Sequence, residues 1–301
     1  MQFQQTLKKN YSFEGKGLHT GKFAKMTVCP APEDTGIVFV RTDIGQDATV
    51  AALAENVSNT TRSTTISQNG ASVSTIEHIL SALTGMGVDN ALIEIDNIEV
   101  PILDGSAKPY IDAIWADGFE LQSQPRKYIE IKEAVEVVNE EVGSIVRIEP
   151  ADEFSYDIKV DFNSRVLGVQ HAVWNPSVTY AEEIGICRTF VFFHEIEFLF
   201  NNGLVKGGDV DNAIVIVEHP VTDQQISRMS GLFNIPALSV REDGYLSNLQ
   251  LRFPNECSRH KLLDLIGDLR LCGGFLKAKV IAEKAGHGIN TKAAKAVRAQ
   301  L

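Results

Sequence analysis

The chain of 301 residues has little cysteine, no long apolar run and no excess of positive charge. Its four cysteines are scattered without C-x-x-C spacing, which indicates reduced thiols and argues against a cysteine zinc site. No apolar run reaches the roughly 20 residues of a membrane-spanning helix, so no transmembrane segment is predicted. A formal net charge of -11 argues against nucleic acid as a partner, because phosphate binding needs a basic surface.

The amino terminus lacks the apolar core of a signal peptide, because its first ten residues read M-Q-F-Q-Q-T-L-K-K-N. We therefore expect a cytoplasmic protein. Hydrophobic residues make up 44% and charged residues 22% of the chain, values that are typical of globular proteins. The length suits two ordinary domains, with one large domain as the alternative.

The first half is predicted to combine strands with two helices. Short alternating runs such as 24–29 indicate strands of an antiparallel sheet. Residues 75–83 have helical spacing, with Ser74 or Thr75 as the expected N-cap, and a second helix is predicted over 109–116.

The second half repeats this layout. D-N-A-I-V-I-V (211–217) echoes D-N-A-L-I-E-I (89–95), and R-H-K-L-L-D-L-I-G (259–267) echoes E-H-I-L-S-A-L-T-G (77–85). The echoes come in a different order in the two halves, so they indicate similar domains without proving a duplication. A further helix is predicted over 193–202.

These patterns predict an α+β fold of two similar domains, each a β-sheet layered with helices. The polar stretch L-Q-S-Q-P-R (121–126) is the best candidate for a linker, which divides the chain into domains 1–125 and 126–301. A polar helical stretch with two prolines indicates an insertion around 218–248 in the second domain. Insertions of this kind often shape substrate sites.

The segment R-H-K-L-L-D-L-I-G-D (259–268) contains the most informative pattern in the chain. If it is helical, His260, Asp264 and Asp268 lie four residues apart along one stripe, and leucines and isoleucine cover the other face. A helix can supply two zinc ligands at positions i and i+4 from a rigid support. Taken alone, the stripe is equally typical of a solvated helix face.

The first predicted helix adds a second histidine, His78, beside Glu77. On its own this pair fits a core histidine next to a surface glutamate. Together with His260 and Asp264, however, His78 completes a set of two histidines and one carboxylate, the ligand pattern of catalytic zinc sites. Glu77 would then be the general base, as in metalloproteases, although their H-E-x-x-H motif is absent.

His287 lies between glycines in A-G-H-G, a predicted loop that can bring an imidazole to a substrate. It is either a loop histidine without function or, with Asp268 on the same stripe as the metal ligands, the acid that protonates a leaving amine.

Several strings taken together resemble the UDP-3-O-acyl-N-acetylglucosamine deacetylase family of lipid A biosynthesis. They occur in matching order from about residue 5 to the end: G-K-G-L-H-T-G-K (15–22), T-I-E-H-I-L-S-A-L (75–83), G-V-D-N (87–90), P-I-L-D-G-S-A (101–107), R-T-F (188–190), K-G-G-D-V-D-N-A (206–213), R-H-K-L-L-D-L-I-G-D (259–268) and G-H (286–287).

The resemblance implies an active site in a cleft between the two domains. It implies that His78, His260 and Asp264 bind Zn²⁺ and that Glu77 is the base. Fe²⁺ is the alternative at the same ligands, because two histidines and a carboxylate do not select sharply among divalent metals. It also implies that His287 is the acid for the departing nitrogen. The substrate would be UDP-3-O-(3-hydroxyacyl)-N-acetylglucosamine, from which acetate is removed.

Further roles follow from the same resemblance. Asp268 would support His287, Thr189 would stabilise the oxyanion, and Lys261 would meet the negatively charged part of the substrate. Phe190 and Phe192 would line the nucleotide and acyl-chain region, with ordinary core packing as the alternative.

The chain departs from the single-function pattern of this family after R-T-F, where Val191 stands in place of a common glycine. The stretch 193–195 and the insertion around 223–248 resemble the variants fused to an acyl-carrier-protein dehydratase, so we expect the deacetylase part of such a fusion. Two other classes remain as alternatives: a metal amidohydrolase acting on a different acetamide, and a binding protein without catalysis. The acyl-chain length and the oligomeric state are not predicted.

Overall fold

The first half of the chain forms a mixed five-stranded sheet. The computed structural model describes residues 2–45, 47–201, 206–209, 211–233 and 238–301. The strands of this sheet, in the spatial order β2-β3-β9-β4-β5, are β2 (Tyr11–Lys16), β3 (Phe23–Pro30), β9 (Ala91–Ile95), β4 (Ile37–Arg41) and β5 (Thr49–Ala51).

The second half forms a sheet with the same connectivity, in the order β12-β13-β18-β14-β15. Its strands are β12 (Val135–Asn139), β13 (Ser144–Pro150), β18 (Phe275–Glu283), β14 (Ser155–Asp161) and β15 (Val169–Trp174), and β11 (Tyr128–Glu130) pairs with β18. The predicted α+β class and the repeated layout of sheet and helices are therefore confirmed.

The central strand of each sheet is the last to be added along the chain. β9 follows helix α1 (Glu77–Gly85), and β18 follows helix α6 (Glu256–Leu269). Each lies antiparallel to one neighbour, β3 or β13, and parallel to the other, β4 or β14. The antiparallel sheet predicted for the first half is confirmed for the pairs β2–β3, β3–β9 and β4–β5, but β4 and β9 pair in parallel. A strand that returns through a helical crossover can pair in this way.

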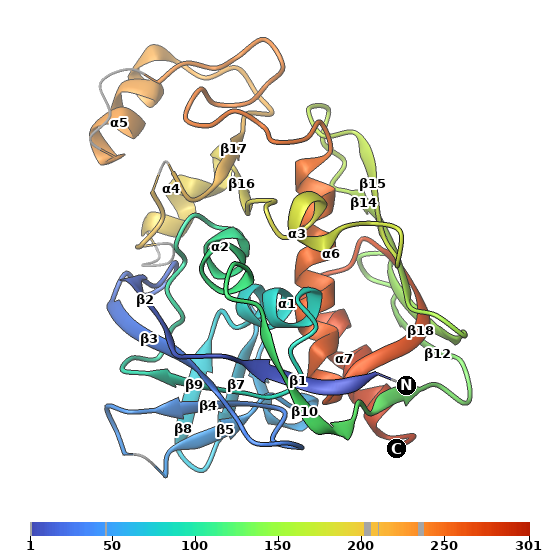
Figure 1. Ribbon diagram of the computed structural model, residues 1–301. Helices are drawn as coiled ribbons and strands as arrows, with labels where there is room; N and C mark the ends of the chain where they lie inside the picture. Colours follow the sequence, from blue (N-terminus) through green and yellow to red (C-terminus); the bar gives the residue numbers. More distant parts are fainter. Residues whose placement is uncertain (1, 46, 202–205, 210, 234–237) are drawn as a thin grey trace.

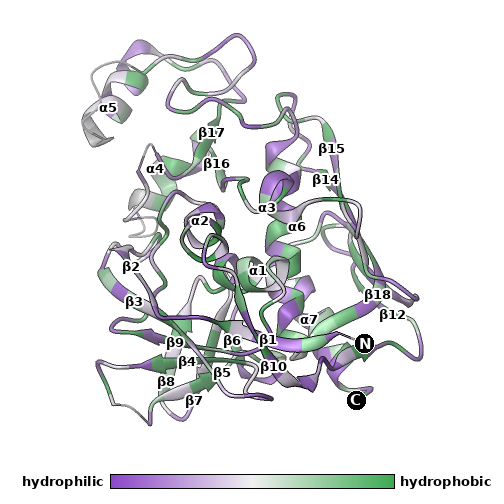
Figure 2. Cartoon of the chain, viewed as in Figure 1, coloured by the Kyte–Doolittle hydropathy of each residue, from purple (hydrophilic) through white to green (hydrophobic). Residues whose placement is uncertain are grey.

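Helices α1 and α6 lie between the two sheets, together with α2 (Lys108–Trp115) and α7 (His287–Arg298) (Figure 1). One hydrophobic cluster runs through both sheets and all four helices. At the contact of α1 with α6, a Cβ on Gly267 would lie 2.0 Å from the backbone oxygen of Glu77, so only glycine permits this approach. Figure 2 shows hydrophilic and hydrophobic segments alternating along α6, which carries polar side chains into this apolar layer.

The predicted linker 121–126 is another correction. Most of it belongs to strand β10 (Phe119–Pro125), which pairs antiparallel with β1 (Phe3–Leu7). The strand is mainly exposed. Phe119 and Leu121 alternate with Glu120 and Gln122, but this alternation is short and runs into S-Q-P, which favoured the interpretation as a linker. The stability of the strand depends on a partner more than a hundred residues away in the sequence.

Smaller elements surround these layers. They are a three-stranded sheet of β6 (Val57–Asn59), β7 (Thr65–Gln68) and β8 (Ala71–Ser74), the parallel pair β16 (Phe190–Phe192) and β17 (Ile214–Ile216), helices α3 (Tyr180–Glu183), α4 (Phe193–Asn201) and α5 (Asp223–Phe233), and the short 3₁₀ helices η1 (Ala54–Asn56) and η2 (Arg270–Cys272). The helix predicted over 193–202 corresponds to α4, and residue 202 falls outside the described residues.

The segment 218–243, which follows β17, begins and ends at the same place in the fold. Val217 N donates to Gly244 O at 2.8 Å, so the two ends of the segment 218–243 meet beside β17. This region, with α4 and α5, has its own small hydrophobic cluster, separate from the main core. Within the described residues, no helix is long and apolar enough to span a membrane.

Candidate active site

Three side chains from two helices converge on one point. His78 is the second residue of α1, and His260 and Asp264 lie one turn apart on α6. Their ligand atoms all lie within 4.8 Å of one another, with His78 Nε2 at 3.6 Å and His260 Nε2 at 3.5 Å from Asp264 Oδ1. All three side chains are buried and line a cavity of about 280 Å³.

The protonation of His260 and Asp264 suits a divalent cation. His260 Nδ1 lies 3.0 Å from the backbone oxygen of Cys187, a contact in which it donates, so Nε2 keeps its lone pair toward Asp264. Burial lowers the pKa of His260 to about 3, which keeps the ring neutral. Burial alone would raise the pKa of Asp264, but the Lys261 ammonium holds it well below its usual range.

Asp264 divides its two oxygens between different tasks. Oδ2 accepts a hydrogen bond from Lys261 Nζ at 2.8 Å. Oδ1 is buried and has no hydrogen-bond partner among the described residues, which is costly for a carboxylate. The orphaned oxygen between two imidazole nitrogens fits the two-histidine, one-carboxylate set of a metal site, so these residues fit a bound zinc or iron(II) ion.

Glu77 opens helix α1 next to this set and is only 3% exposed. Its Oε2 accepts a hydrogen bond from Thr64 N at 3.0 Å, and burial raises its pKa. The predicted N-cap was wrong: the cap position is Ile76, and no side chain caps the helix there. Thr75 instead has a positive φ of 59°, a strained conformation for a β-branched residue, and donates to Glu99 Oε1 at 2.9 Å.

His287 faces Glu77 from the opposite side. It lies not in a loop, as predicted, but at the first position of helix α7. Its Nδ1 is 2.9 Å from Asp268 Oδ2, and its Nε2 is 3.8 Å from Glu77 Oε1. Burial alone would lower the pKa of His287, but the carboxylates of Asp268 and Glu77 raise it to about 9. The imidazole is therefore protonated at neutral pH.

The other residues assigned by resemblance line the same cavity. Thr189 precedes β16, and Phe190 and Phe192 project from the same face of that strand. Both phenylalanine rings also contact Phe162, at centroid distances of 5.4 and 5.9 Å. Lys261 lines the cavity as well, where its Nζ lies 5.6 Å from the Phe190 ring centroid.

The sequence analysis missed two residues close to the predicted catalytic residues. The hydroxyl of Thr64 donates to Asp268 Oδ1 at 2.5 Å, and Asn290 Nδ2 donates to Asp268 Oδ2 at 2.9 Å. Both are buried polar side chains, but neither has a sequence context that distinguishes it from an ordinary surface residue. The partner of Thr64, Asp268, lies 204 positions away in the sequence, so no local signal could have identified Thr64.

His19 and Glu99 form a second group to which the sequence analysis assigned no role, although His19 belongs to the string G-K-G-L-H-T-G-K (15–22). His19 lines the cavity, and its Nε2 is buried without a hydrogen-bond partner within the described part of the chain. Glu99 holds the loop that carries His19, because its oxygens accept from His19 N and Thr20 N, each at 2.8 Å. The same carboxylate binds Thr75, so it links this loop to the start of α1.

Comparison with known proteins identifies the family of the chain. The model of the UDP-3-O-acyl N-acetylglycosamine deacetylase family matches residues 4–233 and 229–299. The chain is 43% identical over 301 residues to the bifunctional enzyme LpxC/FabZ of Porphyromonas gingivalis, which covers 100% of this chain and 65% of that protein. It is 40% identical over 292 residues to UDP-3-O-acyl-N-acetylglucosamine deacetylase of Saccharophagus degradans, over 96% of this chain and 88% of that protein.

A third relative, UDP-3-O-acyl-N-acetylglucosamine deacetylase of Syntrophus aciditrophicus, is 38% identical over 301 residues, which is 100% of this chain and 87% of that protein. The chain spans less than two thirds of the length of its bifunctional relatives, in agreement with the likeness to fused variants seen in the sequence. With the family model covering most of its residues, the chain belongs to the UDP-3-O-acyl N-acetylglycosamine deacetylase family.

Proposed function

We propose that the chain is a zinc- or iron(II)-dependent hydrolase that removes acetate from UDP-3-O-(3-hydroxyacyl)-N-acetylglucosamine in lipid A biosynthesis. One observation carries the proposal. A buried ligand set of His78, His260 and Asp264 shares one cavity with a raised-pKa carboxylate, Glu77, and a protonated imidazole, His287. Amide hydrolysis needs these parts: a Lewis acid site, a base for water and an acid for the amine.

The three ligands would hold the metal, which supplies Lewis acidity that polarises the acetamide carbonyl and acidifies water. Asp264 offers Oδ1 to this site, while Lys261 holds Oδ2 and fixes the orientation of the carboxylate. The hydrogen bond from His260 Nδ1 to Cys187 O orients the other ligand on the same helix.

Glu77 takes the proton of the attacking water. Its Oε2 is held by Thr64 N, whereas Oε1 faces the cavity on the side of His287. A buried carboxylate has a raised proton affinity, which makes Glu77 a better base than a solvated glutamate.

His287 gives a proton to the departing glucosamine nitrogen. As the C–N bond breaks, the hydroxyl from water stays on the acetyl carbon and the nitrogen leaves as a neutral amine. Asp268 fixes the imidazole through Nδ1, so Nε2 carries the proton that is directed into the cavity. The raised pKa of His287 keeps this acid charged at the pH at which Glu77 acts as a base.

The remaining roles concern the substrate. Thr189 would stabilise the oxyanion from its position at the cavity wall, and Lys261 would meet the negatively charged part of the substrate. Phe190 and Phe192 would contact the nucleotide and the acyl chain. Because Phe162 packs on both rings and is 41% exposed, this aromatic group extends from the cavity toward solvent.

We also propose that the chain divides into domains 1–125 and 126–301, with an insertion around 218–248, and that it acts in the cytoplasm. The shared connectivity of the two sheets supports the division. The four cysteines are free thiols, three of them buried, which suits a reducing compartment.

The test of the proposed function is the release of free amine and acetate from UDP-3-O-(3-hydroxyacyl)-N-acetylglucosamine by the purified chain. Activity should disappear after chelation and return with zinc or iron(II). A matched assay with UDP-N-acetylglucosamine lacking the acyl chain separates this activity from that of a general amidohydrolase. Equal turnover of both substrates, or activity that survives chelation, would overturn the proposal.

A further inference from the structure

Arg188 opens the R-T-F string but has no part in the proposed mechanism. It is only 5% exposed, and its partner Glu256 is fully buried. Arg188 Nε donates to Glu256 Oε1 at 2.9 Å, and Nη2 donates to Oε2 at 3.2 Å. A buried ion pair loses much hydration energy, and apolar residues of similar size are often at least as stabilising. Stability alone therefore does not account for this pair.

Glu256 joins Arg188 to the helix that carries two of the proposed metal ligands. It is the first residue of α6, and it also accepts from the backbone N–H groups of Arg188, at 3.1 Å, and Arg252, at 2.5 Å. The segment 187–189 leads from α3 to β16 and is bound in this way to the start of α6 (Figure 1).

The peptide group between Cys187 and Arg188 is bound to α6 at both ends. Its N–H donates to Glu256, and its carbonyl oxygen accepts from His260 Nδ1, one helical turn further along, at 3.0 Å. Because a peptide group is planar, the contact with Glu256 also fixes the direction of the Cys187 carbonyl. The orientation of the His260 imidazole therefore depends on the position of Arg188.

Thr189, the next residue, lines the catalytic cavity. Its N–H donates to Gly105 O, and its carbonyl oxygen accepts from Ile214 N, each at 2.8 Å. Three consecutive residues thus have three different tasks: Cys187 orients a proposed metal ligand, Arg188 binds the segment to α6, and Thr189 forms part of the cavity wall.

We propose that Arg188 is a positioning residue for the proposed reaction. Through Glu256 it fixes the peptide group that orients His260, and it holds Thr189 at the cavity wall. The part that concerns Thr189 rests on the proposed function, whereas the part that concerns His260 is a statement about metal binding alone. Groups that orient a metal ligand typically change metal affinity or activity by roughly 10- to 100-fold when they are removed.

The test compares Arg188→Met with the unaltered chain in two measurements. The first is the zinc affinity of the folded chain, determined by competition with a chelator. The second is kcat and KM for UDP-3-O-(3-hydroxyacyl)-N-acetylglucosamine at saturating zinc. We expect zinc binding to weaken roughly 10- to 100-fold and kcat to fall about tenfold. KM should change little, because Arg188 does not line the cavity.

Arg188→Lys provides the conservative comparison. Lysine keeps the positive charge beside Glu256 but lacks the planar pair of donors that binds both carboxylate oxygens. Its zinc affinity and kcat should lie between those of Arg188→Met and the unaltered chain.

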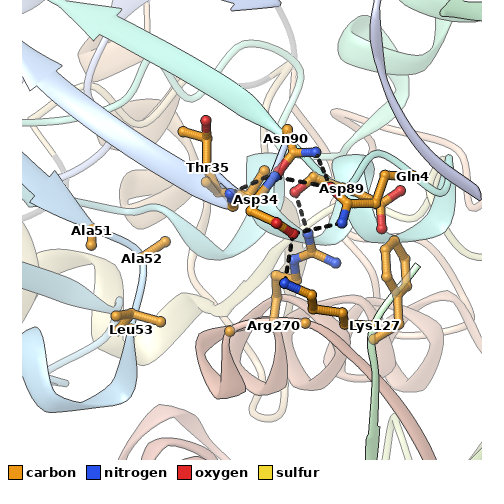
Figure 3. A pocket seen from close by; sticks show the side chains of 15 residues that line it. Gln4, Asp34, Thr35, Ala51, Ala52, Leu53, Asp89, Asn90, Lys127 and Arg270 are labelled. Carbon is orange, nitrogen blue, oxygen red and sulfur yellow. Dashed lines mark hydrogen bonds and ion pairs between the residues drawn. The ribbon is translucent and has the colours of Figure 1, made fainter. Parts of the chain in front are cut away.

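Arg126→Met is the matched control. Arg126 pairs with Asp89 through Nη2 at 2.7 Å and Nε at 2.9 Å, and its side chain is 4% exposed, compared with 6% for Arg188. Asp89 lines a different cavity, shown in Figure 3, which shares no lining residue with the catalytic cavity. Arg126→Met should lower the stability of the fold but leave zinc affinity and kcat unchanged below its unfolding transition.

Unchanged zinc affinity and kcat in a folded Arg188→Met would overturn the proposal. An equal loss of both in Arg126→Met would also overturn it, because the effect would then be one of stability. If Arg188→Met does not fold, Arg188→Lys decides: zinc affinity and kcat equal to those of the unaltered chain would exclude the positioning role. A chain that binds zinc but does not act on the substrate would refute the proposed function, while the zinc affinities still test the role of Arg188.

Discussion

The hydroxyl of Thr64 donates to Asp268 Oδ1 at 2.5 Å, across 204 positions of the sequence. The backbone N–H of the same residue donates to Glu77 Oε2 at 3.0 Å. Thr64 therefore contacts both the proposed base and the carboxylate that orients the proposed acid, although it does not line the catalytic cavity. Thr64 thus helps to fix the carboxylates of Glu77 and Asp268, both of which lie close to the imidazole of His287.

This relationship gives a first prediction. Thr64→Val keeps the shape and the backbone N–H but removes the hydroxyl donor from buried Asp268. We expect kcat to fall about tenfold, equivalent to ~1.4 kcal/mol of a lost charge-assisted hydrogen bond. KM should change little, because the residue does not reach the cavity. Thr64→Ser retains the donor and should restore most of the rate; equal kcat in all three proteins would exclude the positioning role.

The zinc content of variants distinguishes the proposed base, Glu77, from the adjacent proposed metal ligand, His78. Glu77→Gln should retain zinc and lose activity by roughly 10²- to 10⁴-fold, because the general base is removed while the ligands remain. His78→Ala should lose both zinc and activity, since one of three ligands is gone. Elemental analysis of zinc per chain, together with the kinetic assay, shows whether each variant has lost the metal or only the activity. Full zinc content in His78→Ala would contradict the ligand assignment.

The raised pKa of His287 predicts a decline of the rate at alkaline pH. The acid must be protonated, so kcat/KM should fall as the pH rises through the pKa of this group, about 9 in the metal-free chain. Asp268→Asn removes the largest contribution that raises this pKa and should move the alkaline limb to lower pH. Asp161→Asn, which alters a half-buried carboxylate that is bound to Lys284 and does not line the catalytic cavity, is the control and should leave the limb in place.

The same shift predicts a dependence of stability on pH. The folded-state pKa of His287 lies above the ordinary value of 6.5, so its protonation stabilises the folded metal-free chain. The stabilisation is complete below about pH 6.5 and is lost as the pH rises through about 9. Urea unfolding of the metal-free chain at a series of pH values should show this loss, and Asp268→Asn should reduce it. A pH-independent difference between the two proteins would argue against the shift.

The sequence predicted the parts of the site that follow from local periodicity. The spacing of His260, Asp264 and Asp268 on one helix, and the adjacency of Glu77 and His78 on another, require only the pitch of an α-helix, and both helices are present. What could not be predicted depends on partners far along the chain. Thr64, the strand at 119–125 and the positive φ of Thr75 are all determined by tertiary contacts.

The close contact of the two helices gives a last prediction, on Gly267. A Cβ at this position would lie 2.0 Å from Glu77 O, and backbone cannot yield as a flexible side chain can. Gly267→Ala should therefore force α6 away from α1, with a loss of about 1–3 kcal/mol in the free energy of unfolding and a larger loss of activity, because the proposed metal ligands come from both helices.

Gly231→Ala is the matched control for this change. Gly231 is also helical, but an added Cβ there would meet nothing within 4 Å. Replacing a helical glycine in open space should leave stability unchanged or raise it by about 0.5–1 kcal/mol. The comparison separates the general effect of a glycine-to-alanine change in a helix from the specific effect of helix contact. Equal stability and zinc content in both variants would show that α1 and α6 do not approach as closely as the catalytic geometry requires.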